Sequence, residues 1–379
     1  PARDLAAAAE IHSRGLFLSA EHRVNILNGA FREIGIGQVA GNYNGMTASA
    51  LTENFARSGS NVFLTGVAFA DSNRDGFYSV GEGQGGIGFA IAGLRAATAT
   101  AGGYGIGLDA TGLQRTTVTV GRLTATLDVA FAGQNIKLDL VNGVELRTSG
   151  SLQLINGITA ARLLGQDDLW LGGTAGADRL WGNSGDNLLR GGAGGDMLYG
   201  GPGRDTAGYG GARGVTADLQ IASANTGDAA GDRYDGIENL SGSIGRDILR
   251  GNNGNNSLWG GDEADYIAAR GGDDTLFGGR ANDVLMGGEG ADLLDGGTDI
   301  DQASYIYALR GVTVDLVTPA ANAGEAAGDR LVGIEDIAGS RFDDILRGDA
   351  GYNMLNGGDG NDRLEGRGGD DRLNGGAGG

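Results

Sequence analysis

The chain has 379 residues, 77 of them glycine, with 3 prolines, no cysteine and a formal net charge of −20. The glycines follow no Gly-x-y period, which excludes a collagen. The acidic balance lacks the basic footprint of a nucleic-acid binder, and no apolar run is long enough for a transmembrane helix. Because disulfides are excluded, we expect metal ions to stabilise the acidic, glycine-rich half.

The N-terminal region, residues 1–57, has its own character. A helical pattern covers 5–17, Ser19 is placed to cap a second helix over 20–28, and 31–41 and 49–59 read as strands joined by NYNG. We expect no signal peptide at residue 1. Since 375–379 (GGAGG) stop inside a repeat, we interpret both ends as cut and the sequence as part of a longer chain.

The motif S-x-x-H-R-x-N-I-L beginning at Ser19, followed by G-x-G and T-x-x-F strands, resembles the C-terminal part of a bacterial CAP (SCP-like) domain. The resemblance implies that His22 stands where the family has a cleft histidine. Its second histidine and acidic partners would precede residue 1, and His12 is the other histidine here. We therefore expect a structural His22 rather than a catalytic one. H-E-x-x-H and G-x-S-x-G are absent, so an enzyme is not the favoured interpretation.

Residues 58–147 alternate short apolar runs with Gly, Asp and Asn turns, which predicts a β-sandwich. The segment 71–82 fits D-x-[DN]-x-[DN]-G-x₅-E, a loop that wraps one Ca²⁺. Its predicted ligands are Asp71, Asn73, Asp75, Phe77 (by its carbonyl), Ser79 and Glu82. The setting resembles the calcium-stabilised Ig-like B-type repeats of bacterial surface proteins. An acidic surface hairpin without metal is the alternative. Residues 148–172 are expected to be a linker ending in a cap.

From residue 173 the template G-G-x-G-x-D-x-U-x, with U a large apolar residue, repeats in three blocks, 173–208, 242–304 and 339–379. Glycines permit a tight turn over the first six positions, and the last three form a short strand with U pointing inward. Two motifs make one turn of a flattened coil, so motif n stacks on motif n+2, about 4.8 Å away. The architecture expected is mainly β, with parallel β-roll blocks following the sandwich and a small α+β CAP-like fragment.

This stacking brings the sixth residues into ladders. Two unit charges 5 Å apart repel by roughly 3 kcal/mol at an effective dielectric of 20, whereas a divalent cation between coils reverses the sign. Carboxylate and carbonyl oxygens suit Ca²⁺, so we predict several calcium ions and a largely unfolded state without them. The predicted ligands are Asp178, Asn187, Asp196, Asp205, Asp247, Asn256, Asp265, Asp274, Asp283, Asp292, Asp301, Asp344, Asn353, Asp362 and Asp371.

These blocks resemble the repeats-in-toxin (RTX, haemolysin-type) calcium-binding β-roll. The resemblance implies secretion in an unfolded state by a type I system and folding on extracellular calcium. The second motif of each block carries Asn at position six, which keeps an oxygen ligand without the charge. Ala207 and Ala303 are weak U residues that indicate the end of a core.

Two similar inserts, 209–241 and 305–338, separate the blocks; GVTADL in the first matches GVTVDL in the second. Each is expected to form one or two longer strands plus a loop that re-enters the roll. For Asp228, Asp232, Glu325 and Asp329, further calcium binding and a solvated loop are both open.

The favoured function is that of an extracellular bacterial protein, secreted or on the cell surface, with a structural, adhesive or surface-assembly role. Its partners would be calcium and a cell-surface or self-assembly partner. The alternative is a secreted CAP-domain hydrolase or lipid-binding protein that uses the rolls for export and folding. No aromatic platform supports a carbohydrate binder.

Overall fold

The computed structural model describes residues 33–43, 46–56, 62–79, 81–211 and 213–378. The chain divides into two units, Pro1–Leu164 and Gly165–Gly379. The predicted N-terminal helices and His22 lie outside the described residues. Strands β1 (Glu33–Tyr43) and β2 (Met46–Ala56) form an antiparallel pair, which confirms the two strands predicted there. The CAP-like assignment of this region stays a prediction.

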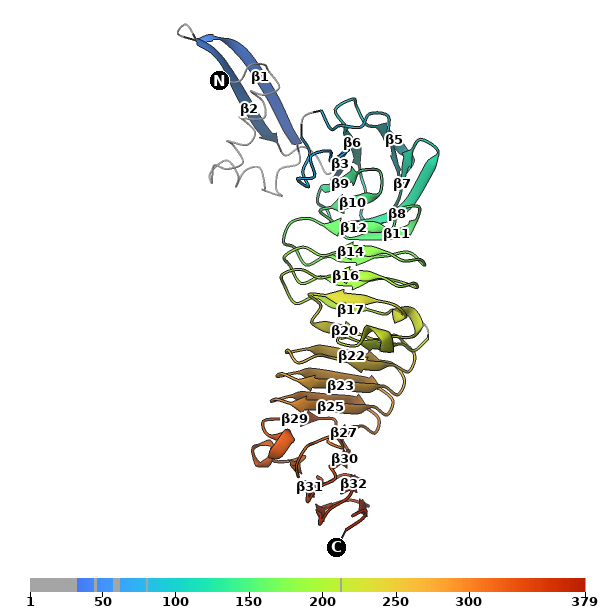
Figure 1. The fold of residues 1–379 in the computed structure, drawn as a ribbon, viewed down its shortest axis with the longest axis vertical. Helices are drawn as coiled ribbons and strands as arrows, with labels where there is room; N and C mark the ends of the chain where they lie inside the picture. Colours follow the sequence, from blue (N-terminus) through green and yellow to red (C-terminus); the bar gives the residue numbers. More distant parts are fainter. Residues whose placement is uncertain (1–32, 44–45, 57–61, 80, 212, 379) are drawn as a thin grey trace. The chain divides into compact units, whose positions relative to one another are not determined.

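The rest of unit 1 contains two sheets (Figure 1). One has the order β12-β10-β9-β3-β6 and the other β11-β8-β7-β4-β5. The strands of the first are β3 Val62–Phe69, β6 Gly103–Leu108, β9 Ile136–Val141, β10 Glu145–Thr148 and β12 Ala160–Leu163. Those of the second are β4 Gly88–Ile91, β5 Leu94–Ala97, β7 Gly112–Val120, β8 Leu123–Phe131 and β11 Leu152–Asn156.

Alternating apolar residues supply the core of unit 1. In β8, Leu127 and Val129 are fully buried while Asp128 between them is partly exposed, the period-2 pattern of a strand with one buried face. Leu64 of β3 and Leu138 of β9 are equally buried. The predicted linker contains β11 and β12, which pair with β8 and β10. The Ig-like assignment and the predicted domain boundaries stay predictions.

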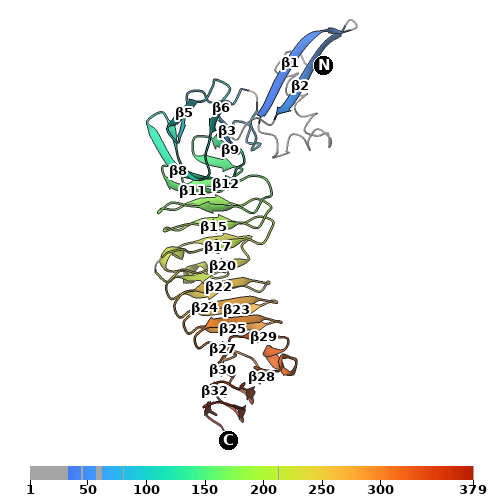
Figure 2. The ribbon, with the colours of Figure 1, turned by 180° about the vertical axis from the view of Figure 1, so that it is seen from behind.

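Unit 2 is a stack of short parallel strands (Figures 1 and 2). Before the first insert lie β13 Trp170–Gly172, β14 Arg179–Trp181, β15 Leu188–Arg190, β16 Met197–Tyr199 and β17 Thr206–Gly208. Between the inserts lie β21 Ile248–Arg250, β22 Ser257–Gly261, β23 Tyr266–Gly271, β24 Thr275–Arg280, β25 Val284–Glu289, β26 Leu293–Thr298 and β27 Gln302–Ser304. After the second lie β31 Ile345–Arg347, β32 Met354–Asn356, β33 Arg363–Glu365 and β34 Arg372–Asn374.

The pairing of these strands follows the nonapeptide period. Leu258 of β22 faces Leu276 of β24, which in turn faces Leu294 of β26, a register of two motifs per coil. All three leucines have no exposed surface. This confirms that motif n stacks on motif n+2 with the U residue inward, in the mainly β architecture predicted. Each coil adds one apolar side chain to each of two inner columns.

Each insert adds two strands to the sheets that precede it and provides the first strand of another sheet. The first contains β18 Thr216–Asp218, η1 Ala222–Ala224, η2 Gly227–Ala229, β19 Arg233–Asp235 and β20 Asn239–Ser241. The second contains β28 Thr313–Asp315, η3 Pro319–Ala321, η4 Gly324–Ala326, β29 Arg330–Val332 and β30 Asp336–Ala338. In the first, β19 and β20 stack on β16 and β17, while β18 begins the sheet that continues with β21. The second repeats this with β29, β30 and β28.

The re-entry predicted for the inserts is confirmed, but their predicted long strands are wrong. Every insert strand in the described residues has three residues, because the insert turns away from the roll on either side of it; β29 pairs along only part of the six-residue β26. No helix within the described ranges is long and apolar enough to cross a membrane.

Candidate metal centres

The aspartates at position six form ladders along the roll. The backbone N–H of Asp247 donates to Oδ1 of Asp265 at 2.7 Å, and the N–H of Asp265 donates to Oδ1 of Asp283 at 2.7 Å. The same bond recurs on the other edge, from Asn256 to Asp274 at 2.6 Å and from Asp274 to Asp292 at 2.8 Å. Each coil therefore holds the carboxylate of the next coil by one oxygen, in the two rows predicted from the spacing.

The other carboxylate oxygen points into a buried space and lacks a donor. It is Oδ2 in Asp196, Asp205, Asp265, Asp274, Asp283, Asp292, Asp301 and Asp362, and Oδ1 in Asp178. Leaving a buried charged oxygen without a partner is costly, so these sites favour either a proton or a bound cation. A hard divalent cation fits an array of oxygen atoms with no donors among them, and Ca²⁺ tolerates the flexible geometry that a repeat supplies.

The first glycine of the motif leaves room beside this oxygen. A Cβ at Gly260 would lie 2.2 Å from Oδ2 of Asp265 and 2.6 Å from the carbonyl oxygen of Gly278, one coil on. At Gly278 the corresponding distances are 2.3 Å to Asp283 and 2.6 Å to the carbonyl of Gly296. A carboxylate oxygen and a carbonyl oxygen from successive coils thus approach the same point, which only glycine leaves open.

Burial shifts the acidity of the ladder. Desolvation raises the pKa of Asp292 to about 8 and that of Asp274 to about 7, although each accepts a backbone hydrogen bond that opposes the shift. For Asp292 the charges of Asp329 and Asp274 add to the rise. Without a cation such carboxyls retain protons near neutral pH, and a bound divalent ion would restore their ionised form.

No group of three or more His, Cys, Asp or Glu side chains gathers around one point in the described residues. The nonapeptide explains this, because each motif contributes one position-six carboxylate and its remaining oxygens are backbone carbonyls. Any ion bound there would take most of its ligands from the main chain. The residues present fit calcium on that basis.

The predicted ligands differ in how many hydrogen bonds their side-chain oxygens already accept. At the start of the second block, Ser243 donates to Asp247 from its N–H at 2.6 Å and from its hydroxyl at 2.9 Å. Ser340 does the same for Asp344. Asn256 accepts from the N–H of Asn252 at 2.8 Å. At the starts of the second and third blocks, therefore, both oxygens of the position-six carboxylate already accept hydrogen bonds, whereas Oδ1 of Asp178 in the first block does not.

The asparagines were predicted as uncharged ligands, and the structure gives their amides a further bond. Nδ2 of Asn256 donates to the carbonyl of Glu238 at 2.7 Å, and Nδ2 of Asn353 to the carbonyl of Glu335 at 2.9 Å. Asn187 accepts from the N–H of Asn183 at 2.7 Å. Asp371, in the last motif, accepts from the N–H of Asn353 at 3.0 Å.

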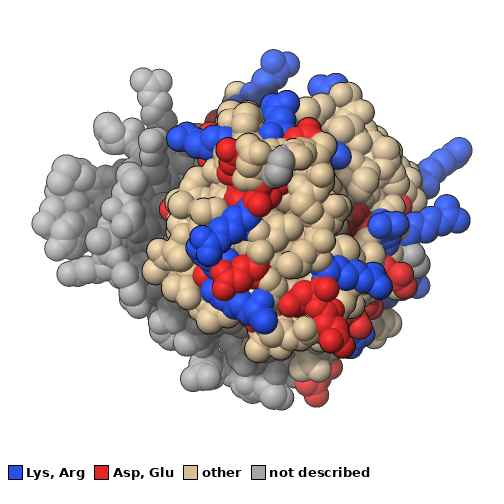
Figure 3. Space-filling model, turned by 90° about the horizontal axis from the view of Figure 1, so that it is seen from below, with Lys and Arg blue, Asp and Glu red and all other residues tan. Residues whose placement is uncertain are grey.

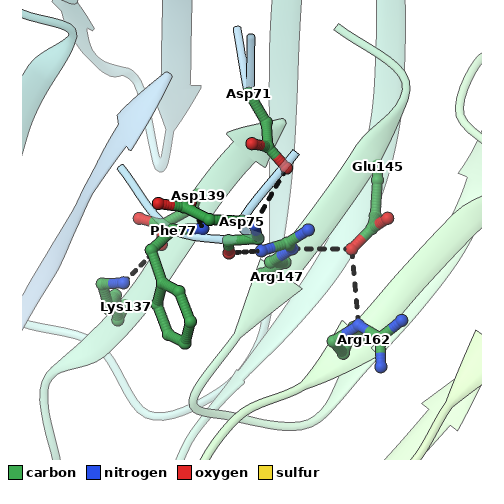
Figure 4. Close-up of polar contacts among 9 residues, drawn as sticks. Asp71, Asp75, Phe77, Lys137, Asp139, Glu145, Arg147 and Arg162 are labelled. Atoms are coloured by element: carbon green, nitrogen blue, oxygen red, sulfur yellow. Dashed lines mark hydrogen bonds and ion pairs between the residues drawn. The ribbon is translucent and has the colours of Figure 1, made fainter. Parts of the chain in front are cut away.

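In unit 1 the loop 71–82 closes on itself (Figure 4). Oδ2 of Asp71 accepts from the N–H of Gly76 at 3.1 Å, and Glu82 accepts from the N–H groups of Ser72 at 2.8 Å and Ser79 at 2.9 Å. Oδ1 of Asp71 is buried without a hydrogen-bond partner. Gly76 has a φ of 80°, which suits the sharp turn that the motif requires.

Within the same loop, Asn73 and Asp75 turn inward to bond the backbone. Oδ1 of Asn73 accepts from the N–H of Asp75 at 3.0 Å, and Oδ1 of Asp75 accepts from the N–H of Phe77 at 2.8 Å. The Asn73 amide also reaches the hydroxyl of Ser79 at 3.2 Å. The six predicted ligands therefore lie in one loop, held in a curved shape by short-range hydrogen bonds. Calcium binding there stays a prediction.

Arg147 of β10 joins this loop to the sheet, a contact that the sequence pattern does not reveal. Its guanidinium donates to the carbonyl of Gly76 and, through Nε, to Glu145 at 2.7 Å. Arg162 of β12 lies 3.5 Å from the same carboxylate (Figure 4). Arg147 is 71 residues from Gly76, so no local motif could indicate the contact.

The surface charge differs from the charge of the ladders. On the face shown in Figure 3, Lys and Arg side chains lie beside Asp and Glu side chains. Most ladder aspartates, in contrast, are among the buried residues. The concentrated negative charge therefore lies inside the roll, where a cation can neutralise it, rather than on this face.

Comparison with family models matches the RTX calcium-binding nonapeptide repeat (4 copies) at residues 172–207, 234–267, 241–276, 269–303, 332–351 and 353–379. The chain thus carries RTX calcium-binding repeats. This match supports Ca²⁺ as the ion that the roll binds. No curated protein matches the chain.

Proposed function

We propose that this is a secreted calcium-binding protein whose C-terminal unit folds around Ca²⁺ and serves as a stiff structural element in adhesion or surface assembly. The row of buried, donor-free carboxylate oxygens carries the proposal, since a calcium-free roll would keep these groups desolvated, either as adjacent charges or as protonated carboxyls. The RTX repeats support the calcium dependence and, by their usual export route, an extracellular site of action.

The remaining features fit a structural role better than a catalytic one. The position-six aspartates of unit 2 accept backbone hydrogen bonds in rows along the roll. In the described residues they are not gathered around one point. The stacked strands bury one apolar side chain after another, among them Leu258, Leu276 and Leu294, so the calcium-loaded roll would be stiff along its length. Such an element presents or spaces whatever is attached to it.

A refolding experiment tests the calcium part. The full chain, unfolded in denaturant, is diluted into buffer with CaCl₂, with MgCl₂ or with chelator, and its β-sheet circular dichroism is recorded. We expect a cooperative gain of signal with millimolar Ca²⁺ and little with Mg²⁺, which demands near-octahedral geometry and gives up its water reluctantly. Equal folding in chelator would contradict the proposal.

The structural role needs a separate test. Calcium-loaded chain is examined by sedimentation velocity for self-assembly and by pull-down on bacterial cells for surface attachment. We expect at least one of the two, lost on chelation. A calcium-folded chain that stays monomeric and attaches to no cell would leave the calcium function intact and overturn the assembly role.

A further inference from the structure

An aspartate from each insert continues the carboxylate ladder of the roll. Oδ1 of Asp232 accepts from the N–H of Asp196 at 2.8 Å, and Oδ1 of Asp329 accepts from the N–H of Asp292 at 3.0 Å. Both side chains are buried. Each stands at position six of a nonapeptide-like segment within its insert, GDAAGDRYD at 227–235 and GEAAGDRLV at 324–332, so the ladder place is kept while its surroundings change.

The second oxygen of these two aspartates differs from that of the aspartates within the blocks. The hydroxyl of Tyr209 donates to Oδ2 of Asp232 at 3.0 Å, and the hydroxyl of Tyr305 donates to Oδ2 of Asp329 at 2.8 Å. Both tyrosines are buried, with 3% and 1% of their surface exposed. The oxygen that lacks a donor in the interior motifs is therefore satisfied in both inserts.

The glycine that makes room beside the carboxylate is also displaced. Five residues before Asp232 stands Gly227, where a Cβ would meet the carbonyl of Gly214 at 3.0 Å and the side chain of Val215 at 3.2 Å. In the second insert Gly324 faces the carbonyl of Gly311 at 2.7 Å. Neither glycine borders the ladder carboxylate, so the insert coils lack the paired oxygens that approach one point in the blocks.

We propose that Tyr209 and Tyr305 take the place of a calcium ion at the inserts, so that these coils are metal-free steps of the ladder. The inference rests on the proposed function, because it assumes that the donor-free oxygens of the blocks bind calcium. A phenol hydroxyl supplies one neutral donor to a buried carboxylate and so removes the need for a cation at that step.

The block starts reinforce this division. Asp247 and Asp344 follow the inserts and are satisfied by the hydroxyl and N–H of Ser243 and Ser340. Along this edge of the roll, calcium would then be confined to the interior of each block and interrupted at both inserts. On the other edge Glu238 and Glu335 take the ladder place, accepting from the N–H groups of Asp205 at 2.8 Å and Asp301 at 2.9 Å.

A matched pair of variants tests the inference. Asp329→Asn and Asp283→Asn both alter a buried ladder aspartate whose Oδ1 accepts a backbone N–H, and they differ in the partner of Oδ2. The full chain is dialysed against calcium at a concentration that just saturates the wild type, and bound ions are counted. We expect Asp283→Asn to bind fewer ions and Asp329→Asn to bind the wild-type number.

The two possible failures are distinguishable. If Asp329→Asn loses bound calcium as Asp283→Asn does, Asp329 is a ligand and the inference is overturned. If Asp283→Asn loses none, the calcium assignment of the blocks fails instead. Circular dichroism in saturating calcium checks that both variants are folded.

Tyr305→Phe gives an independent measurement. Removing the hydroxyl leaves Oδ2 of Asp329 without its donor, so we expect a lower Tm with an unchanged ion count. The second insert is the better choice, since the first has an additional tyrosine, Tyr234, bonded to Tyr209 where the second has Leu331. A Tyr305→Phe protein with wild-type Tm would show that the hydroxyl does not satisfy the carboxylate and would overturn the inference.

Discussion

Apart from Oδ1 of Asp71, the buried carboxylate oxygens in the described residues of unit 1 have hydrogen-bond partners within the protein, whereas most ladder carboxylates of unit 2 keep one oxygen without a partner. In unit 1, Asp139 accepts from the N–H of Val67 at 2.9 Å and pairs with Lys137, while Glu82 takes three backbone N–H groups. In unit 2, Asp283 accepts one N–H and keeps a bare second oxygen. Both units have fully buried leucine cores. The comparison teaches that apolar burial is common to both units, whereas dependence on a cation follows from unsatisfied buried oxygens.

Removing calcium should give the largest difference between the units. With chelator at pH 9, above the raised pKa values of Asp274 and Asp292, we expect the amides of 165–379 to lose their protection from hydrogen exchange, because the ionised, desolvated carboxylates repel without an ion between them. The described strands of 62–164 should keep most of theirs. Hydrogen exchange with mass spectrometry on the full chain reads both units at once. Protection of 165–379 that survives in chelator would remove the distinction.

Core truncation should affect the units equally when calcium is present. Leu276→Ala in the roll and Leu127→Ala in β8 each remove a fully buried leucine. Each should lower the free energy of unfolding by about 2–5 kcal/mol. Denaturant unfolding in saturating calcium, followed separately for each unit by hydrogen exchange, checks this. A much smaller cost in the roll would mean that calcium, and not the leucine column, dominates its stability.

Filling the glycine space should weaken calcium binding and stability together. The Cβ of Gly278→Ala would lie 2.3 Å from Oδ2 of Asp283, and we expect a cost of about 1–3 kcal/mol with a higher calcium midpoint. Gly210→Ala is the matched control, since nothing lies within 4 Å of its Cβ. Equal effects of the two alanines on a calcium titration would contradict the role given to the first glycine.

Acidity should change the calcium requirement of unit 2. The folded-state pKa of Asp274 is raised to about 7 and that of Asp292 to about 8. Their contribution to calcium-free stability is therefore present in acid and is lost as the pH rises through these values. Calcium must displace these protons, so its midpoint should fall roughly tenfold per pH unit for each proton released. Titrations at pH 6 and 8 should differ in this direction; identical midpoints would contradict it.

The loop 71–82 should give the smallest effect. For an extracellular site with a Kd of about 10⁻⁴–10⁻³ M, millimolar calcium stabilises by ~1 kcal/mol. Asp71→Asn should abolish this calcium-dependent rise in the Tm of unit 1, while Asp109→Asn, outside the loop, should retain it. A rise that persists in Asp71→Asn would leave the loop as a metal-free hairpin.

The period of the repeats made much of the roll predictable. A nonapeptide with one inward residue predicts that motif n stacks on motif n+2 and that the inward leucines form columns. It also predicts the two rows that contain Asp265 and Asp274, because every contact repeats a local pattern. The curved loop at 71–82 is similarly local. The bonds that satisfy Asp247 come from Ser243, which replaces the second glycine of the motif, and this departure from the template gave no prediction of the bonds.

The sequence by itself determined the repeat architecture and the chemistry of its ion, because glycine, aspartate and leucine recur at spacings that local geometry converts into a ladder. Only the tertiary structure decided which aspartates of that ladder have both oxygens hydrogen-bonded by the protein. The bond from Tyr305 to Asp329 spans 24 residues, and the one from Arg147 to Gly76 spans 71. Contacts of this kind depend on how an insert or a sheet folds back, and no periodic pattern encodes them.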